Sequence, residues 1–255
     1  MRAARLARRV ALERRWIREY YKQAAPSSFS LPLQPTRRQF RLALKKSTGR
    51  LTFTKIEDRV RDGAVLKRHL ERAAPHHVYF TTSTWLDPQR LGPRDFVKAK
   101  KAGYTLAHNV FLDQGLYFDI DVPGDLSEAA RQLLLLRDFL REGWSFKDFR
   151  AVYSGSKGFH LYVEDFTIRD FVAVEADPRR REEQHPAVKA QFTDAALKAE
   201  IMIDAAVTLD PRRILRVPGT VHGKTLNLCE VVPFERVESF VPRRIPSDGW
   251  RRLLG

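Results

Sequence analysis

The chain contains a single cysteine, Cys229, among its 255 residues. It therefore cannot form an internal disulfide or a zinc site built from several thiolates, and we expect no structural zinc. Long apolar runs are also missing. The longest, Leu133–Leu136, is far short of the roughly 20 residues that cross a bilayer, and Arg131 and Arg137 flank it. We accordingly expect an amphipathic helix there and no membrane partner. The single cysteine suits a protein of the reducing cytoplasm.

Acidic residues are scarce at the start of the chain. Residues 1–50 contain 14 Lys or Arg but only two acidic residues, Glu13 and Glu19, which accounts for about +12 of the total formal charge of +15. A field of this sign favours a polyanionic partner, and nucleic acid is the commonest one. The simpler alternative is a basic, solvated helix face.

The composition and the apolar periodicity indicate a globular α+β chain. Hydrophobic residues make up 43% of it and aromatic residues 11%, which suits a substantial core. Helices are predicted over 2–23, 64–72, 126–141 (capped by Asp125 or Ser127 and ended by Gly143) and 187–200. Strands are predicted within 38–56, split by a turn at 47–49, and over 78–82, 115–122, 149–153, 159–163, 213–217 and 228–232. This order suggests an α+β or mixed α/β fold with an RRM-like palm sheet around 115–232.

We expect one catalytic domain spanning residues 1–255. Within it, residues 1–110 would form a basic unit of helices and strands, 111–235 the palm, and 236–255 a basic tail. The Arg-rich start could be taken for a transit peptide. It has no Ser over 2–23 and contains two Glu, which favours a helix of the fold.

Two carboxylates near the end of an apolar strand are the most informative feature of the sequence. Asp119 and Asp121 point to one face of the predicted strand, while Ile120 points to the other. Adjacent like charges repel, so a cation bound between them is a natural explanation. Hard divalent ions such as Mg²⁺ or Mn²⁺ prefer carboxylate oxygen. The alternative is a solvated strand end.

A second candidate element is the loop Ser154-Gly-Ser-Lys-Gly158, between two predicted strands. Its glycines let the backbone turn tightly and bring N–H groups close to an anion, and Ser154, Ser156 and Lys157 add donors and positive charge. His160 follows on the next strand. The spacing is not that of a Walker A loop, and an ordinary Ser/Gly hairpin is the alternative.

The third element is the segment 203–225. Asp204 ends a short apolar stretch that we interpret as a strand, and it could complete a cage of three carboxylates. Asp210 competes for that role, although Asp210-Pro211 is more typical of a turn or a cap. A basic run is usually a solvated face, but three potential phosphate ligands follow within nine residues: Arg216, His222 and Lys224.

Together the three segments resemble the catalytic (small) subunit of archaeo-eukaryotic primases. Phe118-Asp-Ile-Asp121 is similar to that family's hydrophobic-Asp-x-Asp motif, and Ser154-Gly-Ser-Lys-Gly-Phe-His160 to its Ser-Gly-x-x-Gly-x-His motif. Ile203-Asp204 with Arg216-Val-Pro-Gly-Thr-Val-His-Gly-Lys-Thr225 is similar to its third-Asp segment and the Pro-x-Ser-x-His-x-Lys-Thr stretch that follows. The matches occur in order over about residues 115–225.

The resemblance implies a primase-type catalytic core with defined roles for these residues. Asp119, Asp121 and Asp204 would bind two divalent ions, Mg²⁺ or Mn²⁺, that activate the 3′-hydroxyl and stabilise the pyrophosphate leaving group. The residues implied to bind the triphosphate of an incoming NTP or dNTP are Ser154, Ser156, Lys157, His160, Arg216, His222 and Lys224. Implied partners are a single-stranded DNA template, a primer duplex and a large primase subunit. The implied location is the nucleoid, if the source is a prokaryote.

The chain departs from the family pattern at two points. Many members carry a zinc-binding knob of Cys and His residues, which this chain cannot build with Cys229 alone, and Ser156 stands where relatives often have a basic residue. The indicated function is template-dependent synthesis of short RNA or DNA primers on single-stranded DNA. Alternatives are an end-joining or lesion-bypass polymerase of the same superfamily, a metal-dependent phosphoesterase, and a non-catalytic nucleic-acid-binding subunit of a replication complex.

Overall fold

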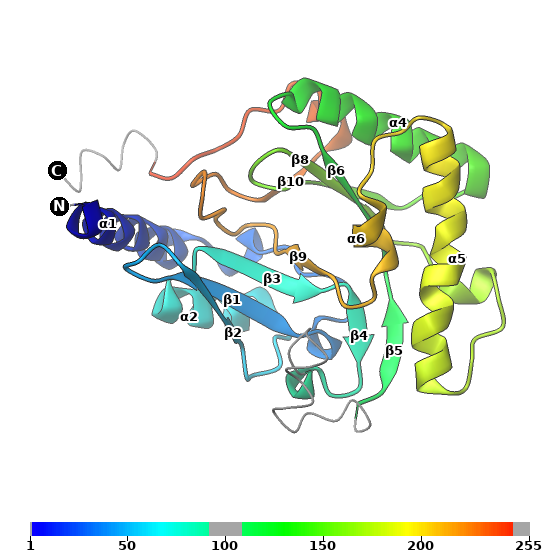
Figure 1. Ribbon diagram of the computed structural model, residues 1–255, viewed down its shortest axis with the longest axis horizontal. Coiled ribbons are helices and arrows are strands. Elements are labelled where there is room, and N and C mark those ends of the chain that lie inside the picture. The colour runs from blue at the N-terminus through cyan, green and yellow to red at the C-terminus, as the bar shows by residue number, and fades with distance from the viewer. Residues whose placement is uncertain (1, 92–108, 247–255) are drawn as a thin grey trace.

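The computed structural model describes residues 2–91 and 109–246 (Figure 1). In this part of the chain, two four-stranded sheets and one two-stranded sheet form the framework, and every strand pair in them is antiparallel. The mixed α+β class expected from the sequence is confirmed. Within the described residues, no helix is both long and apolar enough to cross a membrane.

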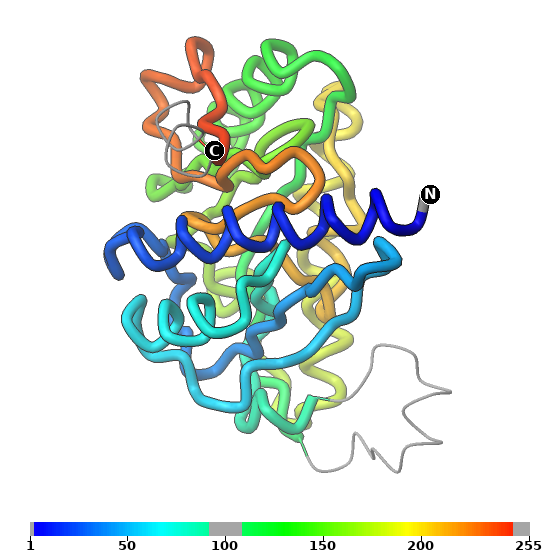
Figure 2. Tube along the Cα trace, turned by 90° about the vertical axis from the view of Figure 1, so that its left-hand side faces the viewer, coloured from blue at the N-terminus to red at the C-terminus, as the bar shows by residue number. Residues whose placement is uncertain are grey.

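The first sheet is built mainly from the N-terminal part of the chain and has the strand order β2-β1-β3-β9. Its strands are β1 (Phe40–Lys45), β2 (Leu51–Lys55), β3 (His77–Thr81) and β9 (Ile214–Arg216). Helices α1 (Arg2–Gln23) and α2 (Gly63–Ala73) pack against each other on one side of it. Figure 2 shows α1 crossing the molecule between α2 and the segment that follows β9.

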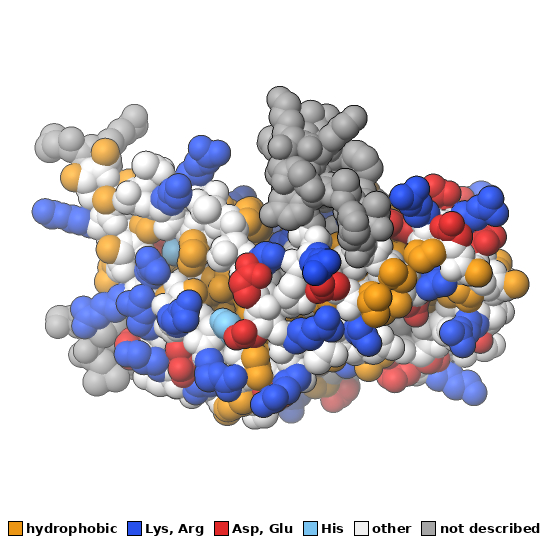
Figure 3. All heavy atoms as spheres, turned by 90° about the horizontal axis from the view of Figure 1, so that it is seen from below, with side chains coloured by type: hydrophobic (Ala, Val, Ile, Leu, Met, Phe, Trp, Pro, Cys, Tyr) orange, Lys and Arg blue, Asp and Glu red, His pale blue; other side chains and the backbone are white. Residues whose placement is uncertain are grey.

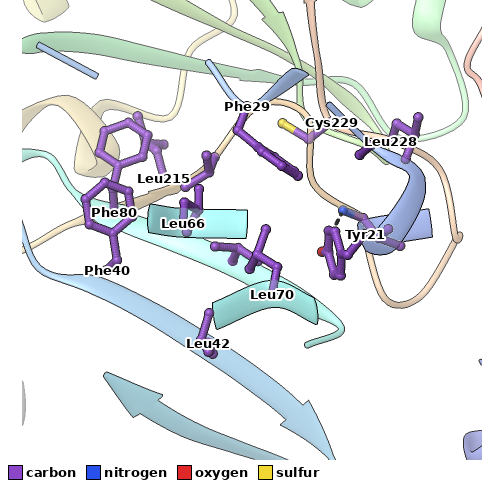
Figure 4. Close-up of a cluster of buried hydrophobic side chains, with 14 of the residues drawn as sticks. Tyr21, Phe29, Phe40, Leu42, Leu66, Leu70, Phe80, Leu215, Leu228 and Cys229 are labelled. Carbon is purple, nitrogen blue, oxygen red and sulfur yellow. Dashed lines mark hydrogen bonds between the residues drawn. The ribbon is translucent and has the colours of Figure 1, made fainter. Parts of the chain in front are cut away.

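A buried apolar cluster holds these elements together (Figure 4). Leu66 and Leu70 of α2 pack with Phe40 of β1 and Phe80 of β3, and all four side chains are almost fully buried. Each such side chain contributes about 1.5–3 kcal/mol by burial. Tyr21 of α1 lies in the same cluster, where its hydroxyl oxygen accepts a hydrogen bond from the Val221 N–H at 3.3 Å. This bond ties the C-terminal segment to the first helix.

The second sheet has the strand order β10-β7-β8-β6. Its strands are β6 (Leu116–Asp121), β7 (Phe149–Tyr153), β8 (Gly158–Val163) and β10 (Glu230–Val232). Helix α4 (Leu126–Trp144) joins β6 to β7, and β8 lies between these two strands and is antiparallel to both. The carboxylate of Asp125 caps α4 by accepting a hydrogen bond from the Glu128 N–H, as expected.

The alternation of side chains along β6 separates a core face from a polar face. Leu116, Phe118 and Ile120 are completely buried in a second apolar cluster, which also contains residues of α4 and of α5 (Pro178–Lys198). Asp119 and Asp121 therefore point to the opposite face, toward the first sheet's side of the molecule.

The remaining elements are short. They are the paired strands β4 (Ser83–Trp85) and β5 (Phe111–Gln114), helix α6 (Ala205–Leu209), and the 3-10 helices η1 (Pro26–Ser28), η2 (Pro35–Arg37), η3 (Pro88–Arg90), η5 (Ile168–Asp170) and η6 (Phe234–Arg236). Helix α6 packs on β6 and α5, which brings the segment after α5 back to the polar face of the second sheet.

Two of the predicted palm strands differ from expectation. The strand expected over 213–217 forms as β9, but it pairs with β3 in the first sheet, where Arg216 lies opposite Tyr79. Residues 201–204 form no strand, and Asp204 instead caps α6 by accepting a hydrogen bond from the Ala206 N–H. The pairing of β9 with β3 is long-range, so the sequence pattern could not reveal it. The cap is local, and Asp is a typical residue at that position.

Two helix ends also differ. The helix expected over 187–200 begins at Pro178, because the Asp177 carboxylate caps it and proline suits a first helical position. Gly143 does not end α4, which continues to Trp144 and stops with Ser145 at φ 60°. Of the predicted basic tail, residues 247–255 lie outside the described residues.

Candidate active site

Asp119 and Asp121 lie on one face of β6, opposite residues of the second candidate element. In the β6–β8 ladder Asp119 pairs with His160, and Asp121 with Gly158. The Nε2 atom of His160 lies 3.5 Å from Oδ1 of Asp119, and Nζ of Lys157 lies 3.6 Å from Oδ2 of Asp121. The Asp pair and the glycine loop, which are distant in sequence, thus form one site.

Gly158 allows this close approach of the two strands. A Cβ atom at this position would come within 1.8 Å of the Ile120 carbonyl oxygen, so any other residue would have to displace the backbone. Because Ile120 separates Asp119 from Asp121, the spacing between the carboxylates and the loop depends on this glycine.

Asp204 is brought to the same site by the cap of α6. Its backbone N–H donates to the Asp119 carbonyl oxygen at 2.8 Å, and its Oδ1 accepts from the Ala206 N–H at 3.0 Å. Its Oδ2 lies 3.5 Å from Nη2 of Arg213. Asp210, the competing candidate, instead accepts a 2.8 Å hydrogen bond from the Arg212 N–H, which fits the turn that Asp210-Pro211 predicted.

The glycine loop is packed against the third candidate segment. Gly155 adopts φ 87°, and a Cβ atom there would lie 2.6 Å from the Cβ of His222, so His222 sits directly on the loop. The Thr225 hydroxyl donates to the Gly155 carbonyl oxygen at 2.6 Å and lies 2.9 Å from Nδ1 of His222. Thr225 therefore fixes both the loop and the imidazole.

Arg216 connects the loop to the first sheet. Its Nη1 donates to the Ser154 carbonyl oxygen at 3.2 Å, and its guanidinium lies 5.5 Å from the centre of the Tyr79 ring. Its Nε lies 3.5 Å from Nδ1 of His77, whose ring meets that of His222 edge to face at 4.9 Å.

Two of the predicted residues are less firmly placed. The Ser156 carbonyl oxygen accepts a hydrogen bond from the Tyr153 hydroxyl, but in the part of the chain that the structure describes, no hydrogen bond joins the Ser156 hydroxyl to another candidate side chain. Lys224 is exposed, and its charge acts on His77 and His222. It therefore lies at the edge of the site.

Sequence reasoning missed four residues of this arrangement: His77, Tyr79, Arg213 and Thr225. The alternation of strand β3 puts His77 and Tyr79 on one face, but only the pairing of β3 with β9 brings that face to Arg216. Arg213 could be recognised only as part of a basic run. Thr225 ends the stretch that resembles the primase motif, yet its bonds to the loop depend on tertiary contacts.

The three carboxylates lie within electrostatic reach of one another. Burial, together with the charges of Asp121 and Asp204, raises the pKa of Asp119 to about 7, against the opposing effect of Arg216 and Arg213. Without a bound cation, Asp119 is therefore only partly ionised at neutral pH.

The histidines of the site are neutral at the same pH. Burial and the Arg216 charge lower the pKa of His160 to about 3. Burial, Arg216 and Lys224 lower the pKa of His222 to about 3. The permanent positive charge next to the glycine loop therefore comes from arginine and lysine side chains.

The chemistry of the donors fits a divalent cation. The Oδ1 atom of Asp119 is buried and has no hydrogen-bond partner among the described residues, a costly arrangement that a bound cation would relieve. Carboxylate oxygens are the preferred ligands of Mg²⁺ and Mn²⁺. In residues 2–91 and 109–246, however, no three His, Cys, Asp or Glu side chains stand close enough to hold a metal ion as they are. The expected cage of three carboxylates is therefore not preformed.

The fold has a counterpart among solved structures. It resembles the solved polymerase domain of ligase D from Mycobacterium tuberculosis, in complex with DNA, with a TM-score of 0.55 over 89% of this chain and 84% of that domain. The two sequences are only 13% identical, so this likeness concerns the fold alone. The chain therefore shares its overall fold with this polymerase domain.

The amino-acid sequence is more similar to those of other proteins than to that of this polymerase domain. The chain is 30% identical to the DNA primase small subunit PriS of Pyrobaculum calidifontis over 197 residues, which cover 63% of this chain and 61% of that protein. It is 26% identical to PriS of Halorubrum lacusprofundi over 193 residues, which cover 69% of this chain and 44% of that protein. The chain is thus a distant homologue of archaeal DNA primase small subunits, which confirms the family resemblance predicted from the sequence.

The similarity is partial in extent. The matched regions span 61% and 44% of these two relatives, less than two thirds of either. No family model matches the chain.

Proposed function

We propose that the chain is a template-dependent nucleotidyltransferase that synthesises short RNA or DNA strands on single-stranded DNA from NTPs or dNTPs. The observation that carries this proposal is that Asp119 lies within electrostatic reach of Asp121 and Asp204, beside a glycine loop and Arg216, in a homologue of primase small subunits. Phosphoryl transfer is catalysed mainly by positioning and by charge neutralisation, and this site offers both.

Asp119, Asp121 and Asp204 would hold the divalent ions, Mg²⁺ or Mn²⁺. Bound there, the ions would neutralise charge on the attacking 3′-hydroxyl and on the pyrophosphate leaving group. Asp204 would have to leave its ion pair with Arg213 to join Asp119, and its backbone bond to Asp119 keeps it within reach.

The triphosphate would lie along the glycine loop. Lys157 and Arg216 would supply charge on either side of it, and Lys224 would add charge at its edge. His160 and His222, both neutral, would supply imidazole hydrogen bonds, with Ser154 and Ser156 as further donors. A helix-free, glycine-rich turn suits this role, because its backbone can approach an anion closely.

The basic N-terminal unit would hold nucleic acid. Figure 3 shows Lys and Arg side chains gathered over the end of the molecule where α1 and α2 lie. Contacts of this kind give binding with steep salt dependence, with a log–log slope of roughly −0.7 to −0.9 per neutralised phosphate. We propose that residues 1–255 act as one catalytic unit, at the nucleoid in a prokaryote, and that a large primase subunit is its partner.

The fold also keeps a second enzymatic candidate open. A repair polymerase of the same superfamily would use the same site, and the likeness to a ligase D polymerase domain favours it. The deciding experiment is synthesis on single-stranded DNA without a primer, offering NTPs and dNTPs separately with Mg²⁺ or Mn²⁺. A primase makes a dinucleotide and extends it, whereas a repair polymerase requires an existing end. A phosphoesterase would release product without consuming nucleotide, and a non-catalytic subunit would do neither.

A further inference from the structure

One face of the first sheet carries a row of aromatic rings that starts at its edge strand. Phe53 of β2 lies opposite Ala43 of β1, which in turn lies opposite His77 of β3. Because Ala43 has only a methyl group, the rings of Phe53 and Tyr79 meet across it with their centres 6.1 Å apart. We call this surface the ring face.

The ring face leads to the candidate active site. The Tyr79 ring lies 5.9 Å from that of His77, and the His77 ring lies 4.9 Å from that of His222, which sits on the glycine loop. Arg216 lies over Tyr79. The outermost ring, Phe53, is 54% exposed, which is unusual for a large aromatic side chain on an edge strand.

The charge of the ring face suits a polyanion. The side chains that β1, β2, β3 and β9 place on it include no Asp or Glu. Arg216 borders it on β9, and the exposed Lys46 and Arg50 lie in the turn that joins β1 to β2. Two lysines at the margin already have carboxylate partners: Lys45 pairs with Glu13, and Lys55 with Glu57.

We infer that the ring face binds the single-stranded DNA template by stacking bases on Phe53 and Tyr79. The inference rests on the proposed function and assigns its template surface. Stacking on aromatic rings tolerates every base, as a template strand requires, because each base has a π-face. Lys46 and Arg50, in the turn next to β2, would supply positive charge for the backbone phosphates of the template. The row ends beside Arg216, so a strand on it runs toward the triphosphate site.

The test is equilibrium binding of a fluorescein-labelled oligo(dT), followed by anisotropy in EDTA and without nucleotide. It uses the full chain and needs no catalysis. Phe53→Ala should weaken binding about fivefold or more, the loss of one stacked base. Phe53→Trp should restore it, and Phe53→Leu, which keeps apolar bulk, should not. Leu33→Ala is the control, since Leu33 is 55% exposed and lies off the ring face.

A second probe replaces the thymines with abasic sites. Wild type should bind this strand more weakly than Phe53→Ala binds oligo(dT), because the stacks on both Phe53 and Tyr79 are lost, and the Phe53→Ala change should then have little further effect. Equal oligo(dT) affinities for wild type and Phe53→Ala, or full binding by Phe53→Leu, would overturn the stacking surface.

A third measurement needs no variant. Photocrosslinking of a 5-iodouracil strand to the wild-type chain should give adducts at Phe53 or Tyr79, and adducts confined to other residues would contradict the inference. None of these outcomes depends on nucleotide incorporation. Primer-free synthesis by the wild-type chain therefore tests the proposed function independently, whether or not the ring face binds the template.

Discussion

The backbone N–H of Asp204 donates a 2.8 Å hydrogen bond to the backbone carbonyl oxygen of Asp119. The bond ties the third acidic segment to the first through main-chain atoms alone. The two carboxylates are therefore held near each other although their charges repel, and the bond itself involves neither side chain. This permits isosteric changes at the acidic residues that test chemistry separately from folding.

Asp119→Asn should abolish nucleotide incorporation while the protein stays folded. The amide cannot replace a carboxylate ligand, so we expect a loss of at least about 100-fold in rate, the scale of a lost electrostatic group at a reaction centre. The thermal midpoint in EDTA should not fall, because the change removes repulsion from Asp121 and Asp204. Incorporation assays and thermal melts provide the readouts. Asp113→Asn, at a half-exposed carboxylate on β5, is the control and should retain synthesis. Activity in purified Asp119→Asn would remove Asp119 from the mechanism.

Arg213→Gln should raise the affinity for Mn²⁺. Arg213 is paired with Asp204, and both side chains are partly exposed, so the charge is screened and its removal should tighten binding only about three- to fivefold. Titration calorimetry without nucleotide measures this directly. Arg212→Gln is a matched control, since the neighbouring arginine pairs with Glu182 instead. Weaker Mn²⁺ binding by Arg213→Gln would mean that Arg213 holds Asp204 in its binding position rather than competing with the ion.

His222→Ala should raise the Michaelis constant for the nucleotide with little effect on template affinity. The ring sits on the glycine loop, and its Nδ1 lies 2.9 Å from the Thr225 hydroxyl. Thr225→Val keeps the size of that side chain but removes the oxygen, so it should give a smaller rise in the same constant. Steady-state kinetics and DNA binding separate the two effects, and His69→Ala, outside the site beside Asp58, is the control. If His222→Ala lost template binding but kept the Michaelis constant for the nucleotide, the triphosphate site would not include His222.

Local sequence patterns predicted the parts of the site that belong to single elements. The alternation along β6 put Asp119 and Asp121 on one face, and the glycines of 154–158 indicated a tight turn. Periodicity could not reveal that β9 joins the first sheet, so Tyr79 went unrecognised as the partner of Arg216. Asp204 is a different case, because it caps α6 through a local hydrogen bond, whereas we interpreted the apolar residues before it as a strand.

Buried histidines should make the protein less stable in acid, and His185 allows a test away from the candidate site. Burial and the charges of Lys189 and Arg181 lower its pKa to about 3, although Asp113 lies 3.4 Å from its Nε2. The unfolded chain takes up a proton near pH 6.5 and the folded chain does not, so stability is lost as the pH falls below about 6.5, by about 2 kcal/mol at pH 5. Urea unfolding from pH 8 to 4 gives the free energy of unfolding at each pH. Below about pH 6.5, the slope of this free energy against pH should be smaller by about one proton for His185→Leu than for the wild type. If the free energies of unfolding of the two proteins depended on pH in the same way, Asp113 would be keeping this histidine charged in the folded chain.

Gly158→Ala should distort the site, whereas Gly143→Ala should stabilise the protein. The added Cβ at position 158 would meet the Ile120 carbonyl oxygen at 1.8 Å, which forces β6 and β8 apart beside Asp119. We expect a loss of about 2 kcal/mol or more in the free energy of unfolding, together with lost nucleotide incorporation. Gly143 lies in α4 with nothing within 4 Å of an added Cβ, so alanine there should gain about 0.5–1 kcal/mol from helix propensity. Denaturant melts and incorporation assays on both variants check the pair. Normal stability of Gly158→Ala would show that the strands tolerate a wider separation than their contact implies.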